Sequence, residues 1–114
     1  MKITKKSFID EMTTNNIHFL GITKKLYSSD ELFCSLSDLL NDNNIILEQR
    51  TYKARSNSLI ANNGSILDFS QFGNYTFYKY QYSNNKYILV CLHTYFDEFD
   101  NVERYKAMYY YINK

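Results

Sequence analysis

Alternation of apolar and polar positions is clearest from Tyr75 to Phe96, where two strand-like runs flank the segment Ser83-Asn84-Asn85-Lys86. Asparagine tolerates left-handed backbone angles, so this segment predicts the turn of a long β-hairpin. The second run is apolar at every position from Ile88 to Leu92, which is typical of a central strand covered on both faces. The first run places a row of tyrosines on one strand face: Tyr78, Tyr80 and Tyr82.

This tyrosine row has two interpretations. In the first, the rings pack across neighbouring strands beneath a helix, which is the commoner role of aromatic residues on a sheet face. In the second, the row is a contact surface that stacks on the bases of single-stranded nucleic acid or supplies hot-spot residues to a protein partner. The pattern favours packing and leaves the contact surface open.

Helical spacing of apolar residues predicts three helices. The first is capped by Thr4, buries Phe8, Ile9 and Met12, and stops at Asn15-Asn16. The second opens with the capping box Ser28-x-x-Glu31 and has an apolar face of Leu32, Phe33, Leu36, Leu39 and Leu40. In the third, Asp100 is the cap, Glu103 follows three residues on, and the apolar stripe is Val102, Tyr105, Met108, Tyr109 and Ile112.

Further strands are predicted between the helices. One runs from Ile17 to Ile22 with a bulge at Gly21, and another from Ile45 to Arg55. Asn57 to Phe69 reads as a second hairpin with a type I′ turn at Asn63-Gly64. Successive strands joined by tight turns form antiparallel sheets. The sequence therefore predicts a single α+β domain over residues 1–114: an antiparallel β-meander of four to six strands with two or three helices packed mainly on one face.

Composition agrees with a folded domain. The chain has 114 residues, 45% of them hydrophobic, and it contains 8 Phe and 12 Tyr, so the core is expected to be rich in aromatic rings. The two cysteines, Cys34 and Cys91, lie far apart in apolar patterns, which indicates buried free thiols in a reducing compartment. Neither a signal-peptide pattern nor a membrane-spanning apolar run occurs, so a cytoplasmic protein without a membrane contact is expected.

The formal net charge is +1, which gives no overall attraction to nucleic acid or to an anionic membrane. The charges are nevertheless segregated. One strand is basic, and its residues Arg50, Tyr52, Lys53 and Arg55 are candidates for tracking a phosphate backbone. A later segment is acidic, and it contains no basic residue: Asp97, Glu98, Asp100 and Glu103.

Catalytic motifs are absent from the sequence. There is no phosphate-binding glycine loop, no nucleophile elbow, no H-E-x-x-H and no C-x-x-C. Cys91 and His93 share a strand face, but residues two apart on a strand are roughly 6–7 Å apart, too far for a nucleophile and its base. The acidic run lacks the glycine and spacing of a calcium loop and is better explained as a helix N-terminus. The sequence therefore predicts no enzyme, no cofactor and no metal site.

Two runs resemble small accessory proteins of phages and mobile elements in low-GC Gram-positive bacteria, some of which are anti-CRISPR proteins. The runs are KARSNSLIANNGSILDF, from Lys53 to Phe69, and FDEFDNVERYKAMYYYI, from Phe96 to Ile112. The resemblance carries no catalytic motif. It implies a small inhibitor that binds a host effector at its nucleic-acid site, with Asp97, Glu98, Asp100 and Glu103 standing in for phosphates. A wholesale DNA mimic would be more acidic than this chain.

Two hypotheses follow. In the first, the protein is a non-enzymatic protein-binding domain whose partner, a host protein, contacts the acidic segment or the tyrosine row. In the second, it is a small nucleic-acid-binding protein that uses the basic strand and the tyrosines. Either is compatible with a monomer or with a homodimer formed through an open sheet edge.

Overall fold

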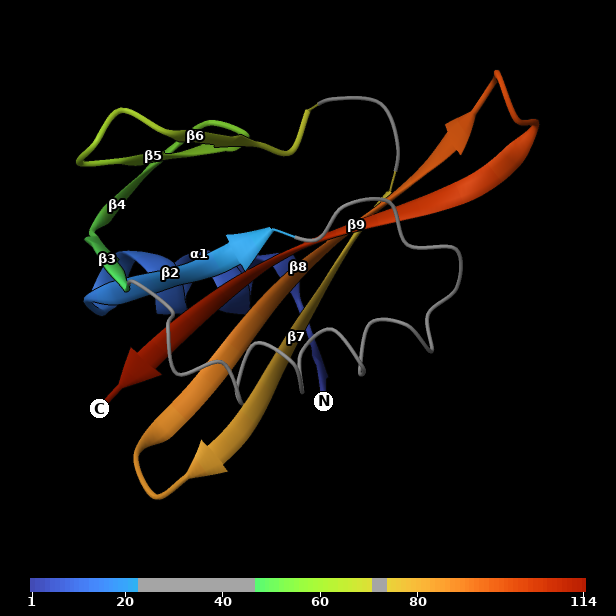
Figure 1. The fold of residues 1–114 in the computed structure, drawn as a ribbon. Helices are drawn as coiled ribbons and strands as arrows, with labels where there is room; N and C mark the ends of the chain where they lie inside the picture. Colours follow the sequence, from blue (N-terminus) through green and yellow to red (C-terminus); the bar gives the residue numbers. More distant parts are fainter. Residues whose placement is uncertain (23–46, 71–73) are drawn as a thin grey trace.

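The computed structural model describes residues 1–22, 47–70 and 74–114, apart from the side chain of Tyr82. Within these residues the chain forms one helix and nine strands (Figure 1). Their order is β1 (Lys2–Ile3), α1 (Lys5–Thr14), β2 (Ile17–Ile22), β3 (Glu48–Arg50), β4 (Tyr52–Arg55), β5 (Ser58–Ala61), β6 (Ile66–Asp68), β7 (Asn74–Ser83), β8 (Lys86–Asp97) and β9 (Val102–Asn113).

The strands form two antiparallel sheets. The larger has six strands in the order β1-β7-β8-β9-β2-β3, and the smaller has three in the order β4-β5-β6. β8 lies at the centre of the large sheet, between β7 and β9, where it pairs Val90 with Tyr78 on one side and with Tyr109 on the other. This position explains its uninterrupted apolar run, because a central strand covered on both faces has no solvent side.

The main core lies between the large sheet and a second layer made of α1 and the small sheet (Figure 1). Phe8 of α1 packs on Phe77 of β7 with ring centroids 4.7 Å apart. Tyr52 of β4 meets Tyr110 of β9 edge to face at 6.0 Å. A second apolar cluster occupies the other face of the large sheet, and its buried members are Ile88, Val90, Leu92, Ala107 and Tyr109.

Several sequence predictions are confirmed. The side chain of Thr4 accepts a hydrogen bond from the Ser7 amide at the start of α1, and the helix buries Phe8 and Met12 before ending at Asn15. The register of β2 against β9 shifts between Phe19 and Gly21, at the expected bulge. The long hairpin is β7 and β8, joined at Asn84-Asn85, and Asn85 has a φ of 62°.

The predicted fold class is wrong. The described residues are mostly strand, in two sheets, and they contain one short helix instead of two or three. The predicted helix beginning at Asp100 is a strand, β9, paired with β8 along its whole length. Apolar residues at helical spacing also fill both faces of a buried strand, and the four tyrosines of β9 favour a sheet. Tyr109 and Tyr110 are accordingly both buried, on opposite faces.

Two finer predictions also need correction. The strand expected from Ile45 to Arg55 is broken at Thr51, so that β3 belongs to the large sheet and β4 to the small one. The hairpin of β5 and β6 exists, but only Gly64 has a positive φ, 90°, whereas a type I′ turn needs two such residues. The helix predicted from Ser28 to Leu40, together with Cys34, lies outside the described residues.

Candidate functional site

The acidic segment forms the tip of the β8–β9 hairpin. Asp97 and Val102 are the last paired residues of the two strands. The carboxylate of Asp97 accepts hydrogen bonds from the amides of Phe99 and Asp100, at 3.0 and 3.3 Å, and Asn101 adopts a φ of 57°. Aspartate and asparagine favour such turns because their short side chains bond to the local backbone and tolerate left-handed angles. The acids expected at a helix N-terminus therefore shape a hairpin turn.

Arg104 neutralises part of this acidic segment. Its guanidinium donates to Asp100 at 2.6 Å and lies 3.5 Å from the carboxylate of Asp97. Arg104 and Asp97 are only 7% and 8% exposed, so the pair is part of the hairpin's structure. Glu98 and Glu103 are exposed, and neither has an ion pair within the described part of the chain. The negative charge available to a partner therefore comes mainly from these two glutamates.

Apolar side chains accompany the acids at the hairpin tip. Phe99 is 100% exposed, Phe96 57% and Val102 40%. The end of the β8–β9 hairpin extends away from α1 and the small sheet (Figure 1). We call Phe96, Glu98, Phe99, Val102 and Glu103 the hairpin tip. Sequence reasoning missed the apolar part of the tip because the pattern predicts a helix over this segment. The signal that could have found it is the presence of three apolar residues among four acids.

The tyrosine row lies on the sheet face opposite α1. Tyr78 and Tyr80 are half-buried, stack on each other at 6.0 Å and pack against the cluster around Ile88 and Val90. Burial raises the pKa of Tyr80, and the neighbouring Tyr78 adds to that effect. The side chain of Tyr82 is not among those that the structure describes. Packing is thus observed for Tyr78 and Tyr80, and a contact role for the row stays a prediction.

The basic strand does not form one surface. Arg50 lies on the Phe19 ring at 4.1 Å and donates to Glu48 at 2.9 Å. Tyr52 is 4% exposed and belongs to the main core. Lys53 and Arg55, on the outer face of the small sheet, are exposed. Of the four residues of the basic strand, only Lys53 and Arg55 are therefore cations that lie together at the surface.

Cys91 is sealed in the main core. It is 0% exposed, and burial raises the pKa of its thiol to about 12. A thiol acts as a nucleophile through its thiolate, which is scarcely populated at neutral pH with such a pKa. The ring of His93 instead stacks on Tyr75, with centroids 4.5 Å apart and planes at 8°. The geometry therefore gives these two residues structural roles.

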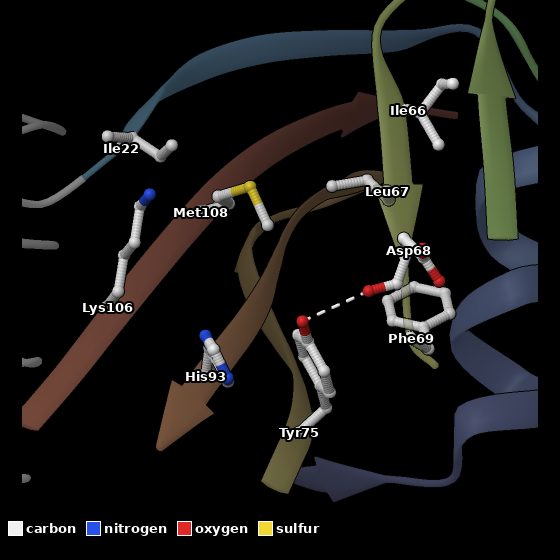
Figure 2. A pocket seen from close by; sticks show the side chains of 9 residues that line it. All are labelled: Ile22, Ile66, Leu67, Asp68, Phe69, Tyr75, His93, Lys106 and Met108. Carbon is white, nitrogen blue, oxygen red and sulfur yellow. Dashed lines mark hydrogen bonds between the residues drawn. The ribbon is translucent and has the colours of Figure 1, made fainter. Parts of the chain in front are cut away.

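A pocket of about 290 Å³ lies between the two sheets (Figure 2). Strand register builds its floor, because Tyr75, His93 and Lys106 are neighbours across β7, β8 and β9. Burial raises the pKa of Tyr75, which keeps its hydroxyl protonated, and that hydroxyl donates to the Asp68 carbonyl at 3.1 Å. Figure 2 shows Lys106 and Ile22 on one wall and Asp68 and Phe69 on the other; the remaining lining residues are Ile66, Leu67 and Met108.

Sequence reasoning missed this pocket for an identifiable reason. A regular ladder from the predicted turn would place Tyr75 opposite Thr94, and it is the register shift between Gln81 and Ser83 that brings Tyr75 opposite His93. The sequence pattern predicts a helix that includes Lys106, so its place beside His93 follows only from the pairing of β8 with β9. The small-sheet wall depends on contact between the two layers, which no local pattern reports.

Comparison with protein-family models, with curated proteins and with solved structures finds no match. In the ranges that the structure describes, no helix has the length and apolarity needed to cross a lipid bilayer. The same ranges contain no group of three or more histidine, cysteine, aspartate or glutamate side chains placed to hold a metal ion.

Proposed function

We propose that the protein is a non-enzymatic protein-binding domain and that the hairpin tip is its contact surface. The observation that supports this most directly is the complete exposure of Phe99, at the end of a hairpin whose turn is fixed by Asp97 and Arg104. Burying a fully exposed aromatic ring at an interface removes a large apolar area from water, and buried aromatic anchors dominate many interfaces.

The charge of the tip indicates the kind of partner. Glu98 and Glu103 flank the apolar residues, so the complementary surface is an apolar pocket with basic groups at its rim. The same acids disfavour an anionic membrane as the target. A basic rim is typical of proteins that bind nucleic acid. We further propose that the partner is a host effector and that the tip occludes its nucleic-acid site, as the resemblance to anti-CRISPR proteins implies.

The test separates contact residues from turn residues. Replacing Asp97 or Asp100 would disturb the Arg104 network, so a loss of binding in such variants would be ambiguous. Phe99→Ala and the double variant Glu98→Lys/Glu103→Lys alter exposed side chains instead. The matched control is Ile66→Ala, because Ile66 is also a large exposed apolar residue, 63% exposed, but lies on β6.

The experiment is a tagged capture from a low-GC Gram-positive bacterial lysate treated with nuclease, followed by a direct affinity measurement on the captured protein. We expect one discrete partner, whose affinity falls at least tenfold in both tip variants and is unchanged in Ile66→Ala, because truncating an interface anchor costs about 2 kcal/mol or more. Equal affinity in all variants would exclude the tip. Capture that disappears with nuclease would move the function to nucleic acid.

A further inference from the structure

The pocket between the two sheets has no role in the proposed function. Its apolar body is formed by Ile22 of β2, Met108 of β9, Leu67 of β6 and Phe69, which directly follows β6 (Figure 2). With about 290 Å³ of space it falls at the small end of ligand pockets. At about 30 Å³ for each water-sized atom, it has room for roughly ten non-hydrogen atoms.

The charges around the pocket are asymmetric. Among the described residues that line the pocket, Lys106 is the only lysine or arginine, and it has no ion-pair partner in the described part of the chain. Asp68, the one acidic residue among the described lining, lies on the opposite wall, where its carboxylate accepts from the amide and hydroxyl of Ser70 at 2.9 and 2.6 Å. These bonds lower the pKa of Asp68, so it stays negative, while no residue that the structure describes forms an ion pair with Lys106.

We propose that this pocket binds a small amphipathic monoanion: one carboxylate on an aromatic or branched aliphatic body of about ten non-hydrogen atoms. The carboxylate pairs with the Lys106 ammonium, as a charge-assisted hydrogen bond at the pocket mouth. The body of the ligand lies against Met108, Leu67 and Phe69 and removes their apolar surface from water. The fixed negative charge of Asp68 on the far wall disfavours a second anionic group on the ligand.

The test uses the full chain and two probes of the same shape, 3-phenylpropionate and its neutral analogue 3-phenylpropanamide. Binding is followed by NMR titration of the methyl signals of Ile22, Leu67 and Met108, which line the pocket. Two variants complete the design. Lys106→Met removes the charge and keeps the length of the side chain, and Lys53→Met is the control, because Lys53 is exposed on β4 and does not line the pocket.

We expect saturable binding of the carboxylate with a dissociation constant on the order of 1 mM or tighter, as good ligands of this size achieve. We expect the amide to bind at least fivefold more weakly, and Lys106→Met to reduce carboxylate binding to the level of the amide. Lys53→Met leaves both affinities unchanged. Failure of both probes to saturate the pocket signals would overturn the proposal. So would equal affinity for carboxylate and amide, or carboxylate binding that persists in Lys106→Met. None of these results depends on whether the hairpin tip binds a protein.

Discussion

The guanidinium of Arg104 donates a hydrogen bond of 2.6 Å to the carboxylate of Asp100, across the turn that joins β8 to β9. The same guanidinium lies 3.5 Å from Asp97, which in turn accepts from two amides of the turn. One cation therefore connects strand β9 to the residue that organises the turn. The hairpin tip depends on this contact for its shape, although none of the three residues is among those we expect to touch a partner.

Replacing Arg104 by methionine should destabilise the protein by about 1.5–3 kcal/mol, because the carboxylate of Asp97, only 8% exposed, loses a charged partner. The control is Asp100→Asn. The Asp100 side chain is 57% exposed, so its loss of charge should cost less than about 1 kcal/mol. Urea unfolding at pH 7 measures both values. Equal effects of the two substitutions would mean that the contact with Asp97 adds nothing to stability.

Two phenylalanines should separate stability from binding. Phe8 is 0% exposed and packs on Phe77, so Phe8→Ala should cost about 3–5 kcal/mol by leaving a cavity in the core. Phe99 is 100% exposed, so Phe99→Ala should change the free energy of unfolding by less than about 0.5 kcal/mol. The two free energies come from the same urea experiment. A large loss of stability in Phe99→Ala would show that the ring packs in the folded protein and is not a free anchor.

Local signals were sufficient for part of this fold. Helix α1 has its cap, its buried pair and its stop within one short segment, so the sequence predicts it without tertiary information. The β7–β8 hairpin has alternation on one strand and asparagines that tolerate left-handed angles at its turn, although no local pattern marks the register shift between Gln81 and Ser83.

Tertiary context decided the rest. In β9, the residues that suggest one face of a helix are buried on two faces of a strand, because β9 lies between β8 and β2. Because the strand is broken at Thr51, Tyr52 lies in the core between the two sheets. The alternation of polar and apolar residues around Tyr52 does not predict this burial. The candidate site could therefore be predicted only in part. The acids at the hairpin tip were identified, whereas the exposure of Phe99 and the place of Lys106 followed only from the strand pairing.

Glu11 should make stability depend on pH. It joins α1 to β7 and to the last residue, with Lys79 at 2.7 Å and Lys114 at 3.2 Å. Partial burial opposes its charge, but the hydrogen bonds from the two lysines outweigh that effect and lower the pKa of Glu11. A carboxyl whose pKa is lower in the folded state stabilises the protein above the pKa it has when unfolded. That contribution is lost as the pH falls through the folded value.

Glu11→Gln should therefore destabilise the protein by about 1 kcal/mol at pH 7, and by progressively less as the pH falls below the pKa of the unfolded carboxyl, about 4.3. Urea unfolding of both proteins across this pH range measures the difference. The control Glu98→Gln removes one negative charge from an exposed residue that has no ion pair within the described residues. A Glu11→Gln effect that stays constant into acid would attribute the loss to packing and not to charge.

The basic strand should bind nucleic acid weakly. Only Lys53 and Arg55 are exposed there, whereas Arg50 is engaged by Glu48 and by the ring of Phe19. Two phosphate contacts give a slope of log K against log salt of roughly −1.4 for a single strand. Fluorescence anisotropy with a single-stranded oligonucleotide should therefore show no saturable binding at about 150 mM salt, and Lys53→Ala/Arg55→Ala should abolish any binding seen at low salt. A steeper slope that survives the double substitution would require cations elsewhere on the molecule. It would also make nucleic-acid binding the stronger hypothesis for the function of the protein.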